Sequence, residues 1–251
     1  MAVSMTSVGE GTRDVRAATQ RRVAPVTADA AGVEHPALAP SNPQRLLNVL
    51  VAGIGLLLAL PLLALVAIAI KLTSRGPVLY VQERVGLDRR LRRGFGDNHR
   101  RQDDLGGRPF RIYKFRTMTA DAEHRSGAVW AAKDDPRVTL VGKFLRQYRL
   151  DELPQLVNVL RGEMNIVGPR PERPAIVRDL REEIEDYRAR HRALPGITGL
   201  AQINHHYDRC LDDVRTKVTY DLEYIRRQSL WEDLKIMVKT VPVMLFRRGG
   251  W

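Results

Sequence analysis

The feature that most constrains the fold of this chain is an apolar run from Leu46 to Ile70, which is 25 residues long and contains no charged side chain. A helix of that length measures about 37 Å, enough to cross a hydrocarbon core of about 30 Å. Asn48 is the only polar residue of the run, and Pro61 lies near its middle. The run therefore predicts a membrane helix that a proline interrupts.

Two membrane arrangements are compatible with this helix. Its length and hydropathy favour a helix that spans the bilayer. A proline kinks a helix because it removes an internal hydrogen bond, so the chain could instead enter the bilayer, bend at Pro61 and return to the same side. Arg45 and Lys71 make both flanks basic, so flanking charge does not choose between the two arrangements. On the residues alone, the spanning helix comes first.

The run divides the chain into three predicted parts. Residues 1–44 show no sustained periodicity and are expected to form a disordered tail, 45–72 the membrane helix, and 73–251 a folded domain. The net charge of +12 belongs mainly to the last part, because residues 71–251 contain 36 of the 41 Lys and Arg but 25 of the 29 Asp and Glu. Such a surface favours nucleic acid, anionic lipid or phosphorylated substrates. A single cysteine, Cys210, excludes an internal disulfide framework and fits a reducing compartment.

The stretch Arg146–Pro174 carries the residues that most directly suggest chemistry. Asp151 is expected to cap a helix with one apolar face, so Asp151 and Glu152 would lie at a helix N-terminus, where the dipole favours anions. Consecutive helix positions point about 100° apart, so we expect different roles for the two carboxylates. One could attack or take a proton, and the other could hold a divalent cation. The alternative is a helix cap and a first-turn charge without a catalytic role.

Arginines near this pair predict contact with phosphate. Arg146 precedes the carboxylates, and Arg170 follows them in the loop Gly168-Pro169-Arg170-Pro171, where two prolines restrict the backbone. Guanidinium groups suit bidentate contacts with phosphate. Because the loop is stiff, Arg170 would lose little entropy on binding.

Two other segments add candidate binding residues. In the predicted strand 110–118, strict alternation places Lys114 and Arg116 on one face, where both could contact a diphosphate. Thr198 and Gln202 follow a Pro-Gly turn and could line a pocket.

The remaining pattern predicts a mostly helical, membrane-associated α/β domain with a small β-sheet. A short strand is expected over 78–81, and an arginine-rich segment over 89–108 is interpreted as a solvated loop. The last predicted helix has an apolar stripe that could pack on the core or lie at a membrane interface. Helices are predicted over 140–150, from Asp151 to 160, over 175–192 and over 230–241.

Several blocks in a fixed order give the chain a resemblance to a known family. The chain resembles the bacterial sugar transferases, the monotopic polyprenyl-phosphate phosphoglycosyl transferases, in their short form. The resemblance covers roughly residues 45–245. It is carried by the apolar run and by GPVLYVQERVG, FRIYKFRTM, LDELPQLVNVLRGEMNIVGPRPERP, PGITGLAQIN and YDLEYIRRQSLWEDLKIMVKTV.

The resemblance implies a reaction and roles for its residues. Family members move a sugar 1-phosphate from a UDP-sugar to a polyprenyl phosphate such as undecaprenyl phosphate, releasing UMP, with Mg²⁺. By similarity, Asp151 would be the nucleophile and Glu152 would assist with the metal or a proton, so both are candidate Mg²⁺ ligands. Arg146 and Arg170 match phosphate-handling arginines, and Asp221 matches a further acidic position of the site.

The resemblance also implies a location and a topology. The family uses a re-entrant helix bent at a proline, here Pro61, so both helix ends would lie in the cytoplasm. The catalytic domain, 73–251, would then work at the inner membrane with interfacial helices against the lipid. The implied task is the first membrane step of exopolysaccharide or other surface glycan synthesis, followed by other glycosyltransferases. Nucleic acid is not an expected partner.

This chain departs from the family pattern at several places. Leu60 replaces a frequent serine before the bend, Asn48 a frequent acidic residue, and Leu200 a frequent tryptophan, while 91–107 resembles an insertion. These departures affect topology and substrate choice, because none involves the Asp-Glu pair. A different class of protein remains as the alternative: a single-span anchored protein whose basic domain binds nucleic acid or anionic lipid without catalysis.

Overall fold

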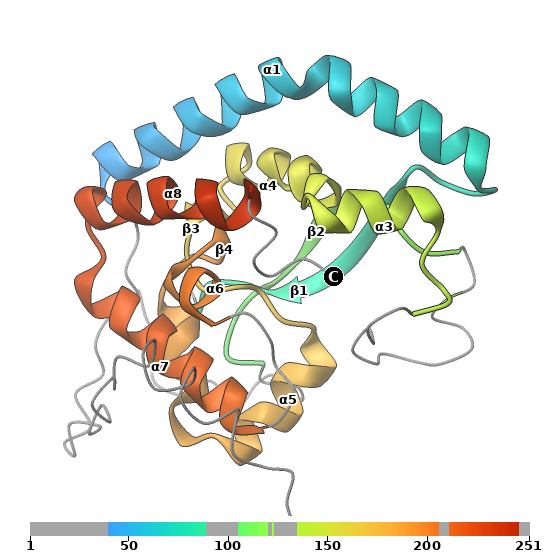
Figure 1. The fold of residues 1–251 in the computed structure, drawn as a ribbon. Helices are drawn as coiled ribbons and strands as arrows, with labels where there is room; N and C mark the ends of the chain where they lie inside the picture. The colour runs from blue at the N-terminus through green and yellow to red at the C-terminus, as the bar shows by residue number, and fades with distance from the viewer. Residues whose placement is uncertain (1–39, 89–104, 120–121, 123–134, 206–210, 246–251) are drawn as a thin grey trace, which may run out of the picture. The chain divides into compact units, whose positions relative to one another are not determined.

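A computed structural model describes residues 40–88, 105–119, 122, 135–205 and 211–245. The predicted tail, 1–44, lies almost entirely outside the described residues, as does most of the arginine-rich segment 91–107. The described chain is mostly helical, with small sheets and one long apolar helix near its start (Figure 1). The prediction of a mostly helical domain is therefore confirmed for this part of the chain.

Helix α1, Asn42–Thr73, contains the whole apolar run. It begins three residues before the predicted boundary, because Ser41 and Gln44 form a capping box. The helix continues through Pro61 as one element and runs past α8, α4 and α3 (Figure 1). Its most apolar 18-residue window has a mean hydropathy of 2.8, and 11% of that window is buried. The helix is long and apolar enough to cross a membrane; a re-entrant path stays a prediction.

The two predicted strands pair with each other in one two-stranded sheet, and the described residues contain a second two-stranded sheet that the sequence had not indicated. Strand β1, Leu79–Val85, pairs antiparallel with β2, Pro109–Phe115, and Tyr80 lies opposite Lys114. Strand β3, Asn165–Val167, pairs in parallel with β4, Gly196–Thr198. The second sheet joins the segment after the carboxylate pair to the segment of Thr198.

Two of the predicted helices are divided. The helix expected from Asp151 consists of a 3-10 helix and a short α-helix, and the helix expected over 175–192 is interrupted at Ile184, which has extended backbone angles and a buried side chain. The remaining elements are α3, Leu140–Gln147; η1, Leu150–Gln155; α4, Leu156–Leu160; α5, Pro174–Glu183; η2, Glu185–Arg192; α6, Leu200–Asn204; α7, Leu211–Arg227; and α8, Leu230–Leu245.

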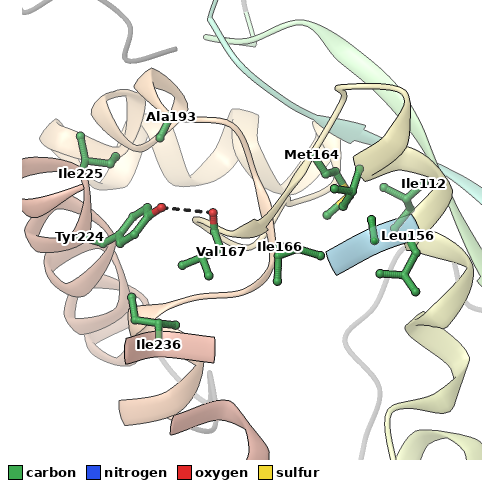
Figure 2. Close-up of a cluster of buried hydrophobic side chains, with 11 residues drawn as sticks. Ile112, Leu156, Met164, Ile166, Val167, Ala193, Tyr224, Ile225 and Ile236 are labelled. Carbon is green, nitrogen blue, oxygen red and sulfur yellow. Dashed lines mark hydrogen bonds between the residues drawn. The ribbon is translucent and has the colours of Figure 1, made fainter. Parts of the chain in front are cut away.

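One hydrophobic cluster ties most of these elements together. Figure 2 shows Val167 and Ile166 of β3 between residues of α7 and α8 on one side and of β2 and α4 on the other. The Tyr224 hydroxyl lies 3.2 Å from the Val167 carbonyl oxygen and 2.8 Å from a carboxylate oxygen of Asp233. Ala52 of α1 is completely buried in the same cluster. Part of the apolar helix therefore belongs to the core of the domain.

Polar residues hold the first turns of α1 against this core. Asn48, the polar residue of the apolar run, accepts a hydrogen bond from the Ile166 amide at 2.6 Å. Arg45 donates to the carbonyls of Val159 and Leu160, at the end of α4, at 2.7 and 2.9 Å. Gln44 donates to Asp233 of α8 at 3.0 Å. These bonds satisfy buried backbone groups and fix where the apolar helix leaves the domain.

Candidate active site

The carboxylate pair lies in η1, a tight 3-10 helix. Arg149 precedes it in a left-handed conformation, with φ of 55°, and Pro154 lies inside it. Asp151 and Glu152 are both buried, at 9% and 5% exposure. The prediction that Asp151 caps an α-helix is wrong: Asp151 lies within the 3-10 helix, whose cap position is occupied by Arg149 without a side-chain hydrogen bond. The tight turn at Arg149 brings both carboxylates into the interior.

Glu152 is bound by cations from two distant segments. Lys114 of β2 donates to Glu152 Oε1 at 2.8 Å, and Arg170 Nη2 donates to the same oxygen at 2.6 Å. Burial opposes the ionisation of Glu152, but Arg170 and Lys114 hold its pKa well below the usual range. Burial lowers the pKa of Lys114, and the charge of Glu152 counteracts that effect. Glu152 is therefore a fixed anion at the centre of the site.

Asp151 has a different environment. Its carboxylate forms no hydrogen bond and no ion pair with any residue that the structure describes. Burial raises the pKa of Asp151 to about 6, and the neighbouring charge of Glu152 adds to that shift, whereas Lys114, Arg146 and Arg170 act against it. An ionised, desolvated carboxylate without hydrogen-bond donors is a good nucleophile or base.

The two cations that were predicted to share a strand face are separated. Lys114 reaches Glu152, but Arg116 donates to the Arg75 and Ser74 carbonyls at 2.7 and 2.9 Å, just beyond the end of α1. The reason is that β2 ends at Phe115, so strict alternation does not extend to Arg116. The structure does not bring Arg116 to the carboxylates, and its contact with phosphate stays a prediction.

Arg146 lies on α3, close to the pair in the chain. Its Nε donates to the Thr117 hydroxyl at 2.9 Å. Burial lowers the pKa of Arg146, and the charge of Asp151 opposes that shift, so the two side chains interact electrostatically. Arg146 therefore belongs to the cationic surroundings of Asp151, although it makes no direct ion pair with it among the described contacts.

The loop that carries Arg170 is held from behind by a buried network. Arg190 of η2 donates to Asp221 Oδ2 at 2.7 Å, to the Tyr187 hydroxyl at 2.8 Å and to the Arg170 carbonyl at 2.9 Å. A Cβ at Gly168 would collide with the backbone of Leu194 and Gly196, so only glycine permits this close approach to β4. Asp221 thus supports the Arg170 backbone through Arg190, and its role at a substrate stays a prediction.

A second set of contacts holds the two residues that follow Arg170, Pro171 and Glu172. Lys217 donates to Glu172 Oε1 at 2.8 Å, and Arg84 donates to the Pro171 carbonyl at 3.0 Å. Burial opposes ionisation of Glu172, but Lys217 and Arg84 lower its pKa to about 2. Sequence analysis missed Arg84, Arg190 and Lys217. Periodicity gave no signal for them, because each lies in a charged segment that resembles a surface helix or strand.

A pocket opens beside Glu152 and brings in the segment of Thr198 and Gln202. Its empty volume is about 570 Å³, including space open to solvent. The Thr198 and Thr240 hydroxyls lie 2.8 Å apart, and the Gln202 amide donates to the Ile197 carbonyl at 2.8 Å. The lining comes from η1, α4, β4, α6 and α8: Arg149, Glu152, Leu153, Leu156, Ile197, Thr198, Gln202, Ile203, Thr240, Val243 and Met244.

The side chains around the carboxylate pair determine whether the site could bind a metal ion. Among the described residues, no group of three or more His, Cys, Asp or Glu lies together in a way that could hold one. The site instead offers two adjacent carboxylates, one of them without a hydrogen-bond donor. This donor set fits magnesium, which commonly binds through one or two carboxylates together with substrate phosphates and water.

Comparison with known proteins identifies relatives. Undecaprenyl-phosphate glucose phosphotransferase of Komagataeibacter xylinus is 46% identical over 208 residues, which are 80% of this chain and 36% of that protein. UDP-glucose:undecaprenyl-phosphate glucose-1-phosphate transferase of Caulobacter vibrioides is 42% identical over 84% of this chain and 72% of its own length. Exopolysaccharide production protein ExoY of Rhizobium meliloti is 35% identical over 83% of this chain and 88% of its own length.

Some relatives are much longer than the matched region, since the chain spans 36% of the Komagataeibacter xylinus protein and 44% and 39% of two further relatives. The family model described as bacterial sugar transferase matches residues 41–247, which include α1, the carboxylate pair and the pocket. The resemblance drawn from the sequence blocks is confirmed: this chain belongs to the bacterial sugar transferase family.

Proposed function

We propose that this protein transfers a sugar 1-phosphate from a UDP-sugar to a polyprenyl phosphate and releases UMP. The observation that carries the proposal is the contrast within the carboxylate pair. Glu152 is neutralised by Lys114 and Arg170, whereas Asp151 is buried without a donor and has a raised pKa. The relatives support the substrate classes, because their names specify UDP-glucose and undecaprenyl phosphate.

In the proposed reaction, an Asp151 oxygen attacks the phosphorus atom that bears the sugar. The bond from that phosphorus to the bridging oxygen breaks, UMP leaves with that oxygen and the electron pair, and an acyl phosphate that joins Asp151 to the sugar phosphate remains. An oxygen of the polyprenyl phosphate then attacks the same phosphorus, which restores the Asp151 carboxylate and yields a sugar linked by diphosphate to the lipid. Arg170, Lys114 and Arg146 would compensate the charge of the phosphoryl group as it moves.

We assign magnesium to the same site, held by Asp151 and Glu152 together with the donor diphosphate. When bound, the ion would neutralise diphosphate charge and favour departure of UMP. The protein side chains have separate tasks: Glu152 orients Lys114 and Arg170, and Asp151 provides the attacking oxygen. This division follows from the different partners of the two carboxylates.

We also propose that α1 enters the inner membrane and returns to the same side near Pro61, with the active site in the cytoplasm. Support comes from the two ends of α1, which both contact the same folded unit. Arg45 bonds carbonyls of α4 at one end, and Arg116 bonds Ser74 beyond the other end. The middle exposes Leu57, Leu58 and Leu65, which suit lipid. At the cytoplasmic side of the inner membrane, the enzyme would begin assembly of an exopolysaccharide or other surface glycan, which later glycosyltransferases would extend.

The test is UMP release from a panel of UDP-sugars by detergent-solubilised protein with magnesium and undecaprenyl phosphate. Wild type should release UMP with one or a few sugars, and Asp151→Asn should lose activity by at least about 10³-fold, since it removes the nucleophile. Asp212→Asn is the matched control, because Asp212 is exposed on α7. EDTA should abolish turnover if magnesium is required. Equal turnover by Asp151→Asn and wild type would overturn the proposal.

A further inference from the structure

The pocket beside Glu152 has a composition that suits an apolar ligand attached to a charged group. Most of its lining is apolar, including Leu153, Ile203 and Val243. The Thr240 hydroxyl donates to the Ile236 carbonyl and the Thr198 hydroxyl lies 2.8 Å from that of Thr240, so neither has a hydrogen left to donate to a ligand. The pocket is open on one side, and its empty volume of about 570 Å³ includes that space open to solvent.

The pocket connects the carboxylate pair with the apolar helix. Glu152 lies in its wall, and so does Leu156. On the other side of that wall is α1, because a Cβ at Gly55 would lie 3.6 Å from Leu156 Cδ1. Helix α8 borders the pocket through Thr240, Val243 and Met244, and its neighbouring Val241 is 54% exposed. An apolar chain in the pocket would therefore lie between the charged site and the surface that suits lipid.

Arg149 lies at the charged end of this pocket. Its guanidinium is 3.9 Å from Glu152 Oε2, and its backbone φ of 55° is unusual for a residue with a side chain. Among the described residues, no other non-glycine residue has a positive φ. Strained backbone of this kind occurs often at ligand sites, where the surrounding structure enforces it. Here the conformation places a guanidinium beside an apolar pocket.

We propose that this pocket binds the first isoprene units of the polyprenyl phosphate acceptor, with Arg149 contacting the acceptor phosphate. The inference rests on the proposed function and adds to it a place for the lipid substrate. An amphiphile with one anionic end matches a pocket that has aliphatic walls and a guanidinium at the end nearest the nucleophile. In this position the acceptor phosphate would lie on the Glu152 side of the site.

The competing occupant is the nucleoside of the donor. Gln202 Oε1 is buried and has no hydrogen-bond partner among the described residues, and a nucleobase N–H could donate to it. The aliphatic lining and the contact with α1 favour the lipid. The two occupants predict opposite kinetic effects when the pocket is filled, so one experiment separates them.

The first experiment fills the pocket with Val243→Trp and compares it with Val241→Trp, which adds the same side chain on an exposed part of the same helix. Values of kcat/KM are measured for the UDP-sugar and for undecaprenyl phosphate separately. Val243→Trp should lower kcat/KM for the acceptor by at least about tenfold and change that for the donor by less than about threefold. Val241→Trp should change neither.

The second experiment removes the guanidinium with Arg149→Gly. Glycine adopts positive φ without strain, so this variant should fold at least as well as wild type, which a thermal melt would check. It should raise the acceptor KM by about tenfold or more, whereas Arg149→Lys, which keeps a cation, should restore part of the loss. Release of UMP from the donor in the absence of acceptor should fall by a smaller factor than turnover with acceptor, because Arg149 also lies 3.9 Å from Glu152.

Each other outcome has a defined meaning. A fall in donor kcat/KM alone for Val243→Trp would assign the pocket to the nucleoside and overturn the inference. Unchanged acceptor kinetics in both Val243→Trp and Arg149→Gly would also overturn it. If wild type released no UMP with any UDP-sugar, the proposed function itself would fail. Failure of the pocket inference alone would leave wild-type activity intact and appear only in the comparison between variants.

Discussion

At the scale of single residues, the central fact is that two neighbouring carboxylates differ in their surroundings. Asp151 and Glu152 are both buried, so desolvation opposes ionisation of each. Glu152 overcomes this cost because Lys114 and Arg170 bond it directly. Asp151 has only more distant charges to compensate, and the negative charge of Glu152 works against it. The pair therefore separates into an anion held by two cations and a carboxylate that ionises less readily.

The pH dependence of the first half-reaction should report this difference. Asp151 has a pKa of about 6, and only its ionised form can attack phosphorus. Below that pH, kcat/KM for the UDP-sugar should fall by about tenfold per pH unit, and above it the value should level off. The measurement is UMP release between about pH 5 and pH 8. A profile that is flat over this range would show that Asp151 titrates at its ordinary pKa or does not react.

Removing the cation of Lys114 should shift that profile. Lys114 lowers the pKa of Asp151 and bonds Glu152 directly, so Lys114→Met should move the acidic limb to higher pH. The limiting rate should also fall by roughly 100-fold, because the cation that bonds Glu152 beside the proposed nucleophile is lost. Lys235→Met is the control, since Lys235 is exposed and pairs only with its neighbour Glu232 among the described ion pairs. An acidic limb at the wild-type position would refute the electrostatic link.

At the scale of elements, short irregular segments carry the site. The 3-10 helix η1 presents the carboxylates, and η2 presents Arg190, which bonds both Asp221 of α7 and the backbone of Arg170. These contacts connect α7 to the loop after β3. The loop is thus fixed by its prolines and by a guanidinium that reaches it from another element.

Breaking the pair between Arg190 and Asp221 should damage both stability and catalysis. Both side chains are 2% exposed, so Asp221→Asn leaves Arg190 buried without a counter-ion and should cost roughly 3–5 kcal/mol in free energy of unfolding. The double variant Arg190→Met with Asp221→Leu should regain most of that stability, but UMP release should stay low because the Arg170 carbonyl loses its donor. Denaturant titration and UMP assays measure the two effects. Full activity in the double variant would show that Arg190 does not position Arg170.

At the scale of the whole molecule, α1 has two functions. Its first turns belong to the domain core through Ala52, Asn48 and Arg45, while its middle exposes large aliphatic side chains. A helix that simply anchored the domain would not need to satisfy the Ile166 amide of β3. The long apolar helix and the scaffold of the candidate site are therefore one structural unit.

The topology of α1 can be tested by labelling its two ends. Asn42→Cys and Arg75→Cys, each in a Cys210→Ser background, place single thiols at exposed positions on either side of the apolar run. If α1 is re-entrant, a membrane-impermeant maleimide should label both in inverted vesicles and neither in intact cells. Labelling of one end from outside the cell would establish a spanning helix and contradict the bend at Pro61.

The sequence alone determined the features that depend on local pattern. The apolar run predicted α1, a short apolar segment predicted β1 and alternation predicted β2, while the Asp-Glu pair among arginines marked the candidate site. These signals are properties of the chain itself. Local pattern also misled in places: the helix from Asp151 became η1, and the helix over 175–192 was interrupted at Ile184.

Only the tertiary structure decided how charges are paired. Lys114 and Arg116 looked equivalent on a strand, yet one bonds Glu152 and the other bonds carbonyls at the end of α1. Arg190 resembled a surface charge, yet it is buried behind Arg170. The physical reason is that an ion pair depends on which segments meet in space and on how much water they exclude. The spacing of residues along the chain shows neither which segments meet nor how much water they exclude.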